Sequence, residues 1–449
     1  MATAGADAPL DLLEGLIARS GRLGAAAADA VLVSGSALEA QCRLGALEEL
    51  TRSESRTLGL RVFVGERQAI VSTTDLADGA LAPLAERAIA MARAVPEDPH
   101  AGLADPARLA RDWPSLDLAD AGEPGADGLL ARALAAEDAA RAVAGVTNSE
   151  GARAGWGRSE VMLVTSGGFA GGFTSSRYSV TAAALAGEGT AMERDYDWSS
   201  AVHEADLDDP ETVGCRAGER AVRRLGAQKA HSGQVPVVYD PRIAGGLLSH
   251  LTGAISGPSI ARGTSFLKDA LETALFAAGT SIVDDPHRAR GLRSRPFDGE
   301  GVGTERREIV ADGMLQTWLL DSRSARQLGL ATTGHATRGV GGPPSPSPSN
   351  LWLEPGAESA DALIADVASG LYVTELIGMG VNGVTGDYSR GAAGFWIEGG
   401  EIAYPVSEVT VAGNLREMYR HLTPASDLAF RYGIDSPTVR IDGMTVAGR

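Results

Sequence analysis

Histidine is the first residue type to consider for chemistry, because two imidazoles on one helix face with an adjacent glutamate form the usual zinc site of hydrolases. The chain has seven histidines. His203 precedes Glu204, but the next histidine along the chain is His231. His250 lies on an expected helix and has no second histidine one turn away. The sequence therefore predicts no metal site in this chain, with His203 at the surface and His250 packed.

Nucleophilic catalysis has no better support in the local sequence. A Gly-x-Ser-x-Gly turn, as in serine hydrolases, does not occur. Ser249 and His250 are adjacent, but neighbours on a helix point apart. Cys42 and Cys215 lack a recognisable catalytic context, so we expect two buried thiols in a reducing compartment. No catalytic residue is predicted.

A dense polar stretch near the C-terminus, residues 384–414, is the strongest candidate for binding. Asp387, Tyr388, Ser389 and Arg390 follow one another there, before a hairpin at 395–406. An arginine at this position could hold a carboxylate or a peptide carbonyl. The alternative is a hairpin whose turn simply needs glycine and aspartate. From the residues alone the two interpretations are equally supported, and Arg338, in TGHATRG, is a second candidate for a peptide cleft.

A third hypothesis uses Asp298 together with Asp387 as a pair of carboxylates for acid–base hydrolysis. Both residues stand in glycine-rich turns, where aspartate is common for local reasons. This hypothesis is the weakest of those considered.

The elements that must position these residues fall into two groups. Periodicity predicts helices near 10–17, 79–95, 126–144 and 209–226, with strands at 58–73 and 159–188. Beyond Ala227–Gly233 the pattern changes to short strands, tight turns and glycine-rich loops, with a helix opened by Asp240-Pro241. We therefore expect an α+β protein with an N-terminal domain at 1–227 and a C-terminal β-rich domain at 228–449. The loop at 341–350 is expected to be a surface excursion or a flap.

The net charge and the hydropathy of the chain limit the kinds of partner that it can bind. The formal net charge of −18 opposes binding to a nucleic-acid backbone, which needs clustered lysine and arginine. The N-terminal segment lacks the features of a signal peptide, and no apolar run reaches the length of a membrane span. We expect a cytoplasmic protein that contacts neither nucleic acid nor membrane.

Five segments together resemble the TldD/PmbA family, and within it the PmbA (TldE) branch, historically labelled a modulator of DNA gyrase. Each segment is moderately specific, and they occur in the family's order. They are LGLRVFVGERQAIVSTTDL (58–76), VVYDPRIAGGLLSHL (237–251), SFLKDALETALFAAGTSIVDDP (265–286), RPFDGEGVGTERREIVADGMLQTWLLD (295–321) and VTGDYSRGAAGFWIEGGEIAYPVSEVTVAGNL (384–415).

The resemblance implies an N-terminal mixed sheet with helices and a C-terminal domain of strongly curved, mainly antiparallel sheets with a few helices. It also implies a cytoplasmic two-subunit metallopeptidase for unfolded or short peptides, with zinc in a TldD-like partner. TldD-type chains carry His-Glu-x-x-x-His on the helix that here reads PRIAGGLLSHL, 241–251. The departure implies that this chain is the subunit without metal and is inactive alone. The resemblance also favours the cleft interpretation of Asp387, Tyr388, Ser389 and Arg390.

Two further expectations concern partners. Alone, the chain is expected to form a homodimer, because the family architecture implies extensive contact between subunits. The alternative function, from a different class, is a non-enzymatic regulator that binds gyrase or an antitoxin, for which an acidic surface is suited.

Overall fold

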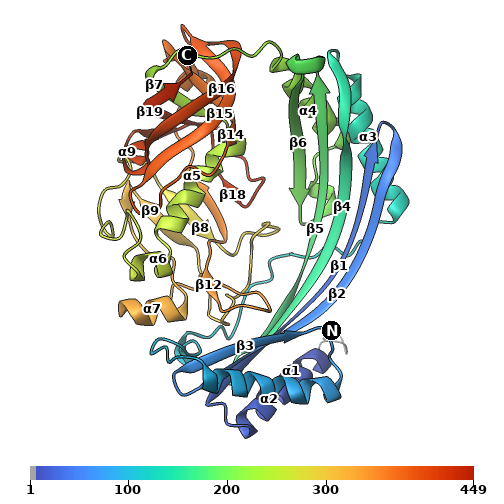
Figure 1. The fold of residues 1–449 in the computed structure, drawn as a ribbon, viewed down its shortest axis with the longest axis vertical. Helices are drawn as coiled ribbons and strands as arrows, with labels where there is room; N and C mark the ends of the chain where they lie inside the picture. Colours follow the sequence, from blue (N-terminus) through green and yellow to red (C-terminus); the bar gives the residue numbers. More distant parts are fainter. Residues whose placement is uncertain (1–6, 449) are drawn as a thin grey trace.

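The computed structural model describes residues 7–448. The N-terminal domain is built on one six-stranded sheet in the order β3-β2-β1-β4-β5-β6, and its long strands run down one side of the molecule (Figure 1). The strands are β1 (Ala27–Arg43), β2 (Ala46–Val64), β3 (Arg67–Thr73), β4 (Val146–Thr165), β5 (Ala170–Ala186) and β6 (Glu193–Ala201). Period-two alternation gives this sheet two different faces.

Four helices cover one face of the sheet in two separate pairs. Helices α1 (Asp7–Arg22) and α2 (Asp78–Ala94) pack at one end, against Leu32 and Leu60 among others. Helices α3 (Ala126–Ala142) and α4 (Pro210–Arg223) pack at the other end, against Leu38 and Trp156. Each pair encloses its own apolar core, and the middle of the sheet lies between the two cores.

Helix α4 corrects one expectation. Its buried face, which includes Gly214 and Gly218, lies close to α3, so the intervening position Cys215 points outward. Cys42 is buried as expected, but Cys215 is exposed. The expectation of two buried thiols is therefore wrong for Cys215.

The C-terminal domain contains two larger sheets, β10-β9-β8-β13-β18 and β16-β15-β14-β7-β19-β17, and pairing of β16 with β19 closes the second into a small barrel. Helix α5 lies in the main core of this domain. The first half comprises β7 (Gly233–Tyr239), α5 (Pro241–Ala254), α6 (Gly257–Ala261), β8 (Ile282–Asp285), β9 (Arg307–Ala311), β10 (Met314–Leu315), α7 (Ser322–Leu328), β11 (Ala336–Thr337) and β12 (Ser345–Pro346). The second half comprises β13 (Asn350–Leu353), α8 (Ala360–Ala365), β14 (Ser369–Ile377), β15 (Asp387–Glu398), β16 (Glu401–Asn414), α9 (Leu415–Arg420), β17 (Leu422–Pro424), β18 (Ile434–Asp435) and β19 (Val439–Ala447).

The α+β class is confirmed. One detail differs from expectation, since every described pairing of the N-terminal sheet is antiparallel and the sheet is not mixed. The reason is that most of its neighbouring strands are joined by hairpins. Parallel pairs occur in the C-terminal domain, between β13 and β18 and between β14 and β7. Among residues 7–448, no helix has the length and apolar character needed to cross a membrane.

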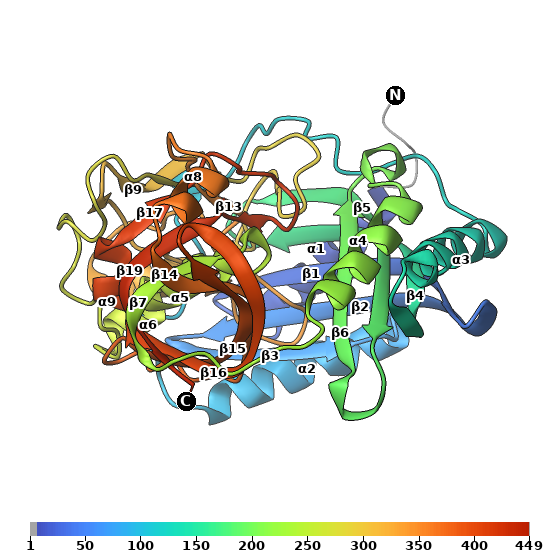
Figure 2. The ribbon, with the colours of Figure 1, turned by 90° about the horizontal axis from the view of Figure 1, so that it is seen from above.

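The two domains face each other across the second face of the N-terminal sheet (Figures 1 and 2). An apolar cluster that includes Val31, Leu163 and Phe297 joins them at one end. The approach is close there, because a Cβ on Gly59 would lie 2.1 Å from the carbonyl oxygen of Val340. The predicted domain boundary falls in the connection between α4 and β7.

Candidate functional site

Helix α5 occupies the position at which the resemblance to TldD-type chains would place a His-Glu-x-x-x-His motif. The Asp240 side chain accepts a hydrogen bond from the backbone N–H of Arg242, and Pro241 occupies the first turn, so the helix begins where the sequence predicted. Its buried residues are aliphatic and small, apart from Thr252. The helix therefore contributes mainly to the core.

His250 is the one titratable side chain in the last turns of α5. Its ring meets the ring of Tyr388 edge to face, with 6.0 Å between centroids. Burial lowers the pKa of His250, and the positive charge of Arg390 lowers it further. Ser249 donates its hydroxyl to the carbonyl of Gly245 instead of to the histidine. As expected, the two adjacent residues do not form a nucleophile–base pair.

Strand β15 begins at Asp387 and separates the four predicted cleft residues onto two faces. Asp387 and Ser389 are exposed, whereas Tyr388 is 2% exposed and Arg390 is half-buried. Arg390 donates from Nε to the carbonyl of Ile377 at 3.3 Å. The structure thus brings Tyr388 and Arg390 to His250, and it places Asp387 and Ser389 toward solvent.

The local contacts of Asp387 also fit a turn. Its carboxylate accepts hydrogen bonds from Thr385 Oγ1 at 2.6 Å and from Asn414 Nδ2 at 3.3 Å. These bonds, that of Thr385 first, lower the pKa of Asp387. Asp298 has a different set of partners, the backbone N–H groups of Glu300, Val302 and Ala336. The two carboxylates share no partner, so nothing in the described residues joins them into an acid–base pair.

Arg338 belongs to a separate cluster where the domains meet. It donates to Asp29 Oδ1, and Arg61 donates from Nε to Asp29 Oδ2 at 2.8 Å. All three side chains are at most 4% exposed. Burial alone would raise the pKa of Asp29, but the two arginines lower it below its usual value. Access of a peptide to Arg338 would require the domains to separate.

Asp298 lies close to this cluster, because a Cβ on its neighbour Gly299 would lie 2.8 Å from the backbone nitrogen of Arg338. Burial, with the nearby charge of Glu300, raises the pKa of Asp298 to about 7. A carboxyl with a raised folded-state pKa stabilises the fold most at low pH, and this contribution is lost as pH rises through about 7. An asparagine side chain does not titrate, so the stability of Asp298→Asn should fall less than that of the wild type between about pH 4 and pH 8. Urea denaturation of both proteins across this range tests the slope, and parallel curves would contradict it.

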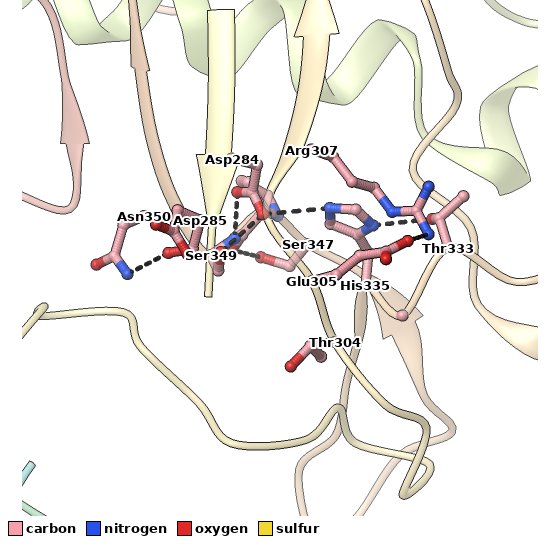
Figure 3. A network of polar contacts seen from close by, with 12 residues as sticks. Asp284, Asp285, Thr304, Glu305, Arg307, Thr333, His335, Ser347, Ser349 and Asn350 are labelled. Atoms are coloured by element: carbon pink, nitrogen blue, oxygen red, sulfur yellow. Dashed lines mark hydrogen bonds and ion pairs between the residues drawn. The ribbon is translucent and has the colours of Figure 1, made fainter. Parts of the chain in front are cut away.

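A buried polar network in the C-terminal domain was missed by sequence reasoning (Figure 3). His335 accepts or donates at both ring nitrogens, with Thr333 Oγ1 2.8 Å from Nδ1 and Asp284 Oδ1 3.2 Å from Nε2. Asp284 also accepts from the hydroxyl of Ser349 at 2.6 Å and from its backbone N–H at 2.7 Å. No short motif links these positions, so only the fold reveals the network.

The order hydroxyl–histidine–carboxylate resembles a catalytic triad, but its setting is structural. The Thr333 hydroxyl already accepts the backbone N–H of Leu320 at 2.8 Å, and His335 is 3% exposed. Through Ser349 and Asn350, both buried, the network anchors the end of the 341–350 loop. This loop is therefore a surface excursion over part of its length only.

The models of known families divide the chain into three parts, two of which fall within the predicted N-terminal domain. Models for domain 1, the central domain and the C-terminal domain of PmbA/TldA metallopeptidases match residues 28–92, 119–225 and 232–448. The chain belongs to the PmbA/TldD family. It is 40% identical to the metalloprotease PmbA of Escherichia coli over 91% of this chain and 89% of that one. A PmbA homologue of Haemophilus influenzae is 38% identical over 94% and 92% of the two chains.

Solved structures of PmbA/TldD relatives share the whole architecture. A protein of Bacteroides thetaiotaomicron, described as a candidate modulator of DNA gyrase, matches with a TM-score of 0.91 and 29% identity over the full length of both chains. TldE of Thermococcus kodakarensis matches with a TM-score of 0.87 over 97% of this chain and 100% of that one. At 19% identity, the second match shows the fold alone.

Because the family consists of metallopeptidases, the donor set of this PmbA/TldD chain has to be compared with what a metal requires. Zinc in a catalytic site takes three protein ligands, usually His, Asp, Glu or Cys. Residues 7–448 contain no group of three such side chains that could hold a metal ion. His250 meets an aromatic ring, and both ring nitrogens of His335 have other partners. The described residues therefore do not fit a zinc ion.

Proposed function

We propose that this chain is the TldE-like subunit without metal of a two-chain cytoplasmic metallopeptidase that degrades or processes unfolded or short peptides. The observation that carries the proposal is helix α5, which presents aliphatic residues, glycine and one aromatic-packed histidine where a TldD-type chain has two zinc ligands and a glutamate. The family membership supports peptide hydrolysis as the reaction of the pair. The partner would supply the metal that activates water.

In this proposal the chain's own residues bind and orient the peptide. Arg390 is the strongest candidate, since its guanidinium is half-buried and bonded to a single backbone carbonyl. Its remaining N–H groups can donate to a carbonyl or carboxylate of a peptide. The rings of His250 and Tyr388 pack against each other, and the charge of Arg390 acts on both residues. The two rings would therefore help to position the Arg390 side chain.

Reconstitution tests this division of labour. The chain purified alone should contain no stoichiometric zinc and cleave no peptide, and addition of its TldD-like partner should produce cleavage. Metal analysis and a peptide-cleavage assay on each chain and on the pair are the measurements. One zinc per isolated chain, lost in His250→Ala or His335→Ala, would refute the proposal.

Light scattering on the same sample should show a homodimer, and a mass near the 46.2 kDa of one chain would contradict that expectation.

The alternative function is regulatory binding without catalysis. Its support is the description of the Bacteroides relative as a candidate modulator of DNA gyrase, together with the acidic charge of this chain. Affinity capture separates the two functions, because recovery of gyrase without a TldD-like chain would favour the regulator. Recovery of a TldD-like chain with peptidase activity would favour the subunit.

A further inference from the structure

The middle of the N-terminal sheet carries two rows of small side chains on the face that looks toward the C-terminal domain. Strand register sets Ser55, Gly35, Ser159 and Ser175 side by side across β2, β1, β4 and β5. The next row on the same face is Ser53, Ala37, Gly157 and Arg177. Val33 and Val161 lie on the same face of the sheet, two residues along their strands from the serine row, because side chains alternate between the faces. They pack against the apolar cluster that joins the domains. The small residues therefore begin where the direct domain contact ends.

A cavity of about 420 Å³ lies over these rows. Its opposite wall is formed by Gly291, Leu292 and Ser294 of the C-terminal domain. A second cavity of about 120 Å³ shares Val202, Gly291 and Leu292 with it. The two cavities are thus parts of one groove between the domains, which we call the interdomain groove.

The charges along the interdomain groove are unusual for a protein of net charge −18. Arg158 and Arg177 line the larger cavity, and none of its described lining residues is acidic. Of the two, Arg177 stands in a row that faces the C-terminal domain, whereas strand alternation directs the side chain of Arg158 to the other face of the sheet. Arg177 donates to the carbonyl of Leu292 at 3.4 Å and forms no ion pair within residues 7–448. Unpaired arginine in an acidic protein favours a negatively charged ligand group.

The smaller cavity is of mixed charge, because Asp206 and Asp435 line it together with three arginines. The guanidinium of Arg288 stands over the ring of Phe430, 3.4 Å from the centroid, and has no ion pair with a described carboxylate. Its neighbour Arg290 is different, because it pairs with Asp117 and Asp206. Arg177 is therefore the better ligand-binding group of the groove, because the negative charges of Asp435 and Asp285 already act on Arg288.

The floor of the groove suits a peptide main chain. The hydroxyls of Ser55, Ser159 and Ser175 make no side-chain hydrogen bond to another described residue, and a hydroxyl can both donate and accept. Adjacent strands lie about 4.8 Å apart, so a row across four strands spans about 14 Å, the length of about four extended residues. The absence of bulky side chains leaves room for the chain to lie flat.

We propose that the interdomain groove binds an extended peptide that carries a carboxylate, with its main chain along the serine row and its carboxylate at Arg177. The choice of a peptide as ligand rests on the proposed function. The carboxylate is either the C-terminus or an acidic side chain, and both present the same chemistry to a guanidinium. Binding requires neither a metal nor the partner chain.

Fluorescence anisotropy with the isolated chain tests this inference. The probes are N-terminally labelled peptides of about ten residues, one acidic and one basic, each with a free or an amidated C-terminus. We expect saturable binding of the acidic peptide and affinity weaker by about tenfold or more for the basic one. Loss of affinity on amidation identifies the C-terminal carboxylate as the bound group, and no loss identifies acidic side chains.

Two variants locate the site. Ser159→Trp fills the floor and Arg177→Glu reverses the charge, and each should weaken binding by about tenfold or more. The matched control is Arg87→Glu, an exposed position on α2 at the other face of the sheet, which should bind as the wild type does. Arg177 is exposed, so its variant should fold even if Ser159→Trp does not. Equal binding by wild type and Arg177→Glu, or no saturable binding of any peptide, would overturn the inference. Failure of the proposed peptidase would show separately, as inactivity of the reconstituted pair.

Discussion

Replacing Asp29 with alanine is expected to destabilise the protein by about 3–5 kcal/mol, because the change leaves two buried arginines without their shared carboxylate. Asp29 is 2% exposed in its side chain, as is Arg338, and Arg61 is 4% exposed. Nε and Nη2 of Arg338 already have no hydrogen-bond partner among residues 7–448. The uncompensated charge would lie at the contact between the domains.

Urea denaturation of Asp29→Ala, with Asp29→Asn as a variant of similar shape, measures this effect. The matched control is Glu54→Ala, which breaks the exposed pair Arg52–Glu54 and should cost about 0–1 kcal/mol. If Asp29→Ala unfolds at the same urea concentration as the control, the ion cluster is not what holds the domains together. The domain contact would then depend on the apolar cluster around Phe297.

The elements that could be predicted from the sequence are those whose signals are local. The Asp240-Pro241 cap marks the start of α5, and the alternation in 58–73 marks the β2–β3 hairpin. The cluster of Asp29 with Arg338 could not be predicted, because it joins two domains across 309 positions of sequence. The sequence offers Arg338 as a cleft candidate, and only the structure shows that its side chain is buried in an ion pair.

The candidate site, too, could be predicted from the sequence only in part. The adjacency of Tyr388 and Arg390 is visible in the sequence, but their approach to His250 depends on how β15 lies against α5. The rows of small residues in the interdomain groove are even harder to recognise in the sequence. Ser55, Gly35, Ser159 and Ser175 come from four strands, and only strand register brings them into line. Serine and glycine in separate strands carry no signal of a common surface.

The ion cluster and the interdomain groove share two strands of the N-terminal sheet. Asp29 and Arg61 lie on β1 and β2, the strands that also supply Gly35, Ser53 and Ser55 to the groove. The contact of Asp29 with Arg338 holds these strands against the C-terminal domain, to which the 291–294 segment of the groove also belongs. Loss of the Asp29 carboxylate should therefore weaken peptide binding as well as stability.

The second large effect is expected at Arg390. In Arg390→Ala the reconstituted pair should cleave peptide about 10- to 100-fold more slowly, the loss for one charge-assisted hydrogen bond of about 1.5–3 kcal/mol to the substrate. The fold should be little affected, because the arginine makes one backbone hydrogen bond, to Ile377, at 3.3 Å. Ser389→Ala, at an exposed position on the same strand, is the control and should keep the wild-type rate.

Three measurements on Arg390→Ala separate a cleft residue from a structural one. The melting temperature should stay close to that of the wild type, since the cost of the lost bond is about 1 kcal/mol. The pKa of His250, followed by NMR, should rise toward its ordinary value, because the positive charge of Arg390 helps to lower it. Gly386→Ala gives the contrasting result, since Gly386 has φ +82° and a Cβ there would lie 3.1 Å from Phe266. If Arg390→Ala instead lowers the melting temperature as Gly386→Ala does and leaves the rate unchanged, residues 387–390 serve the architecture of the hairpin and not the peptide.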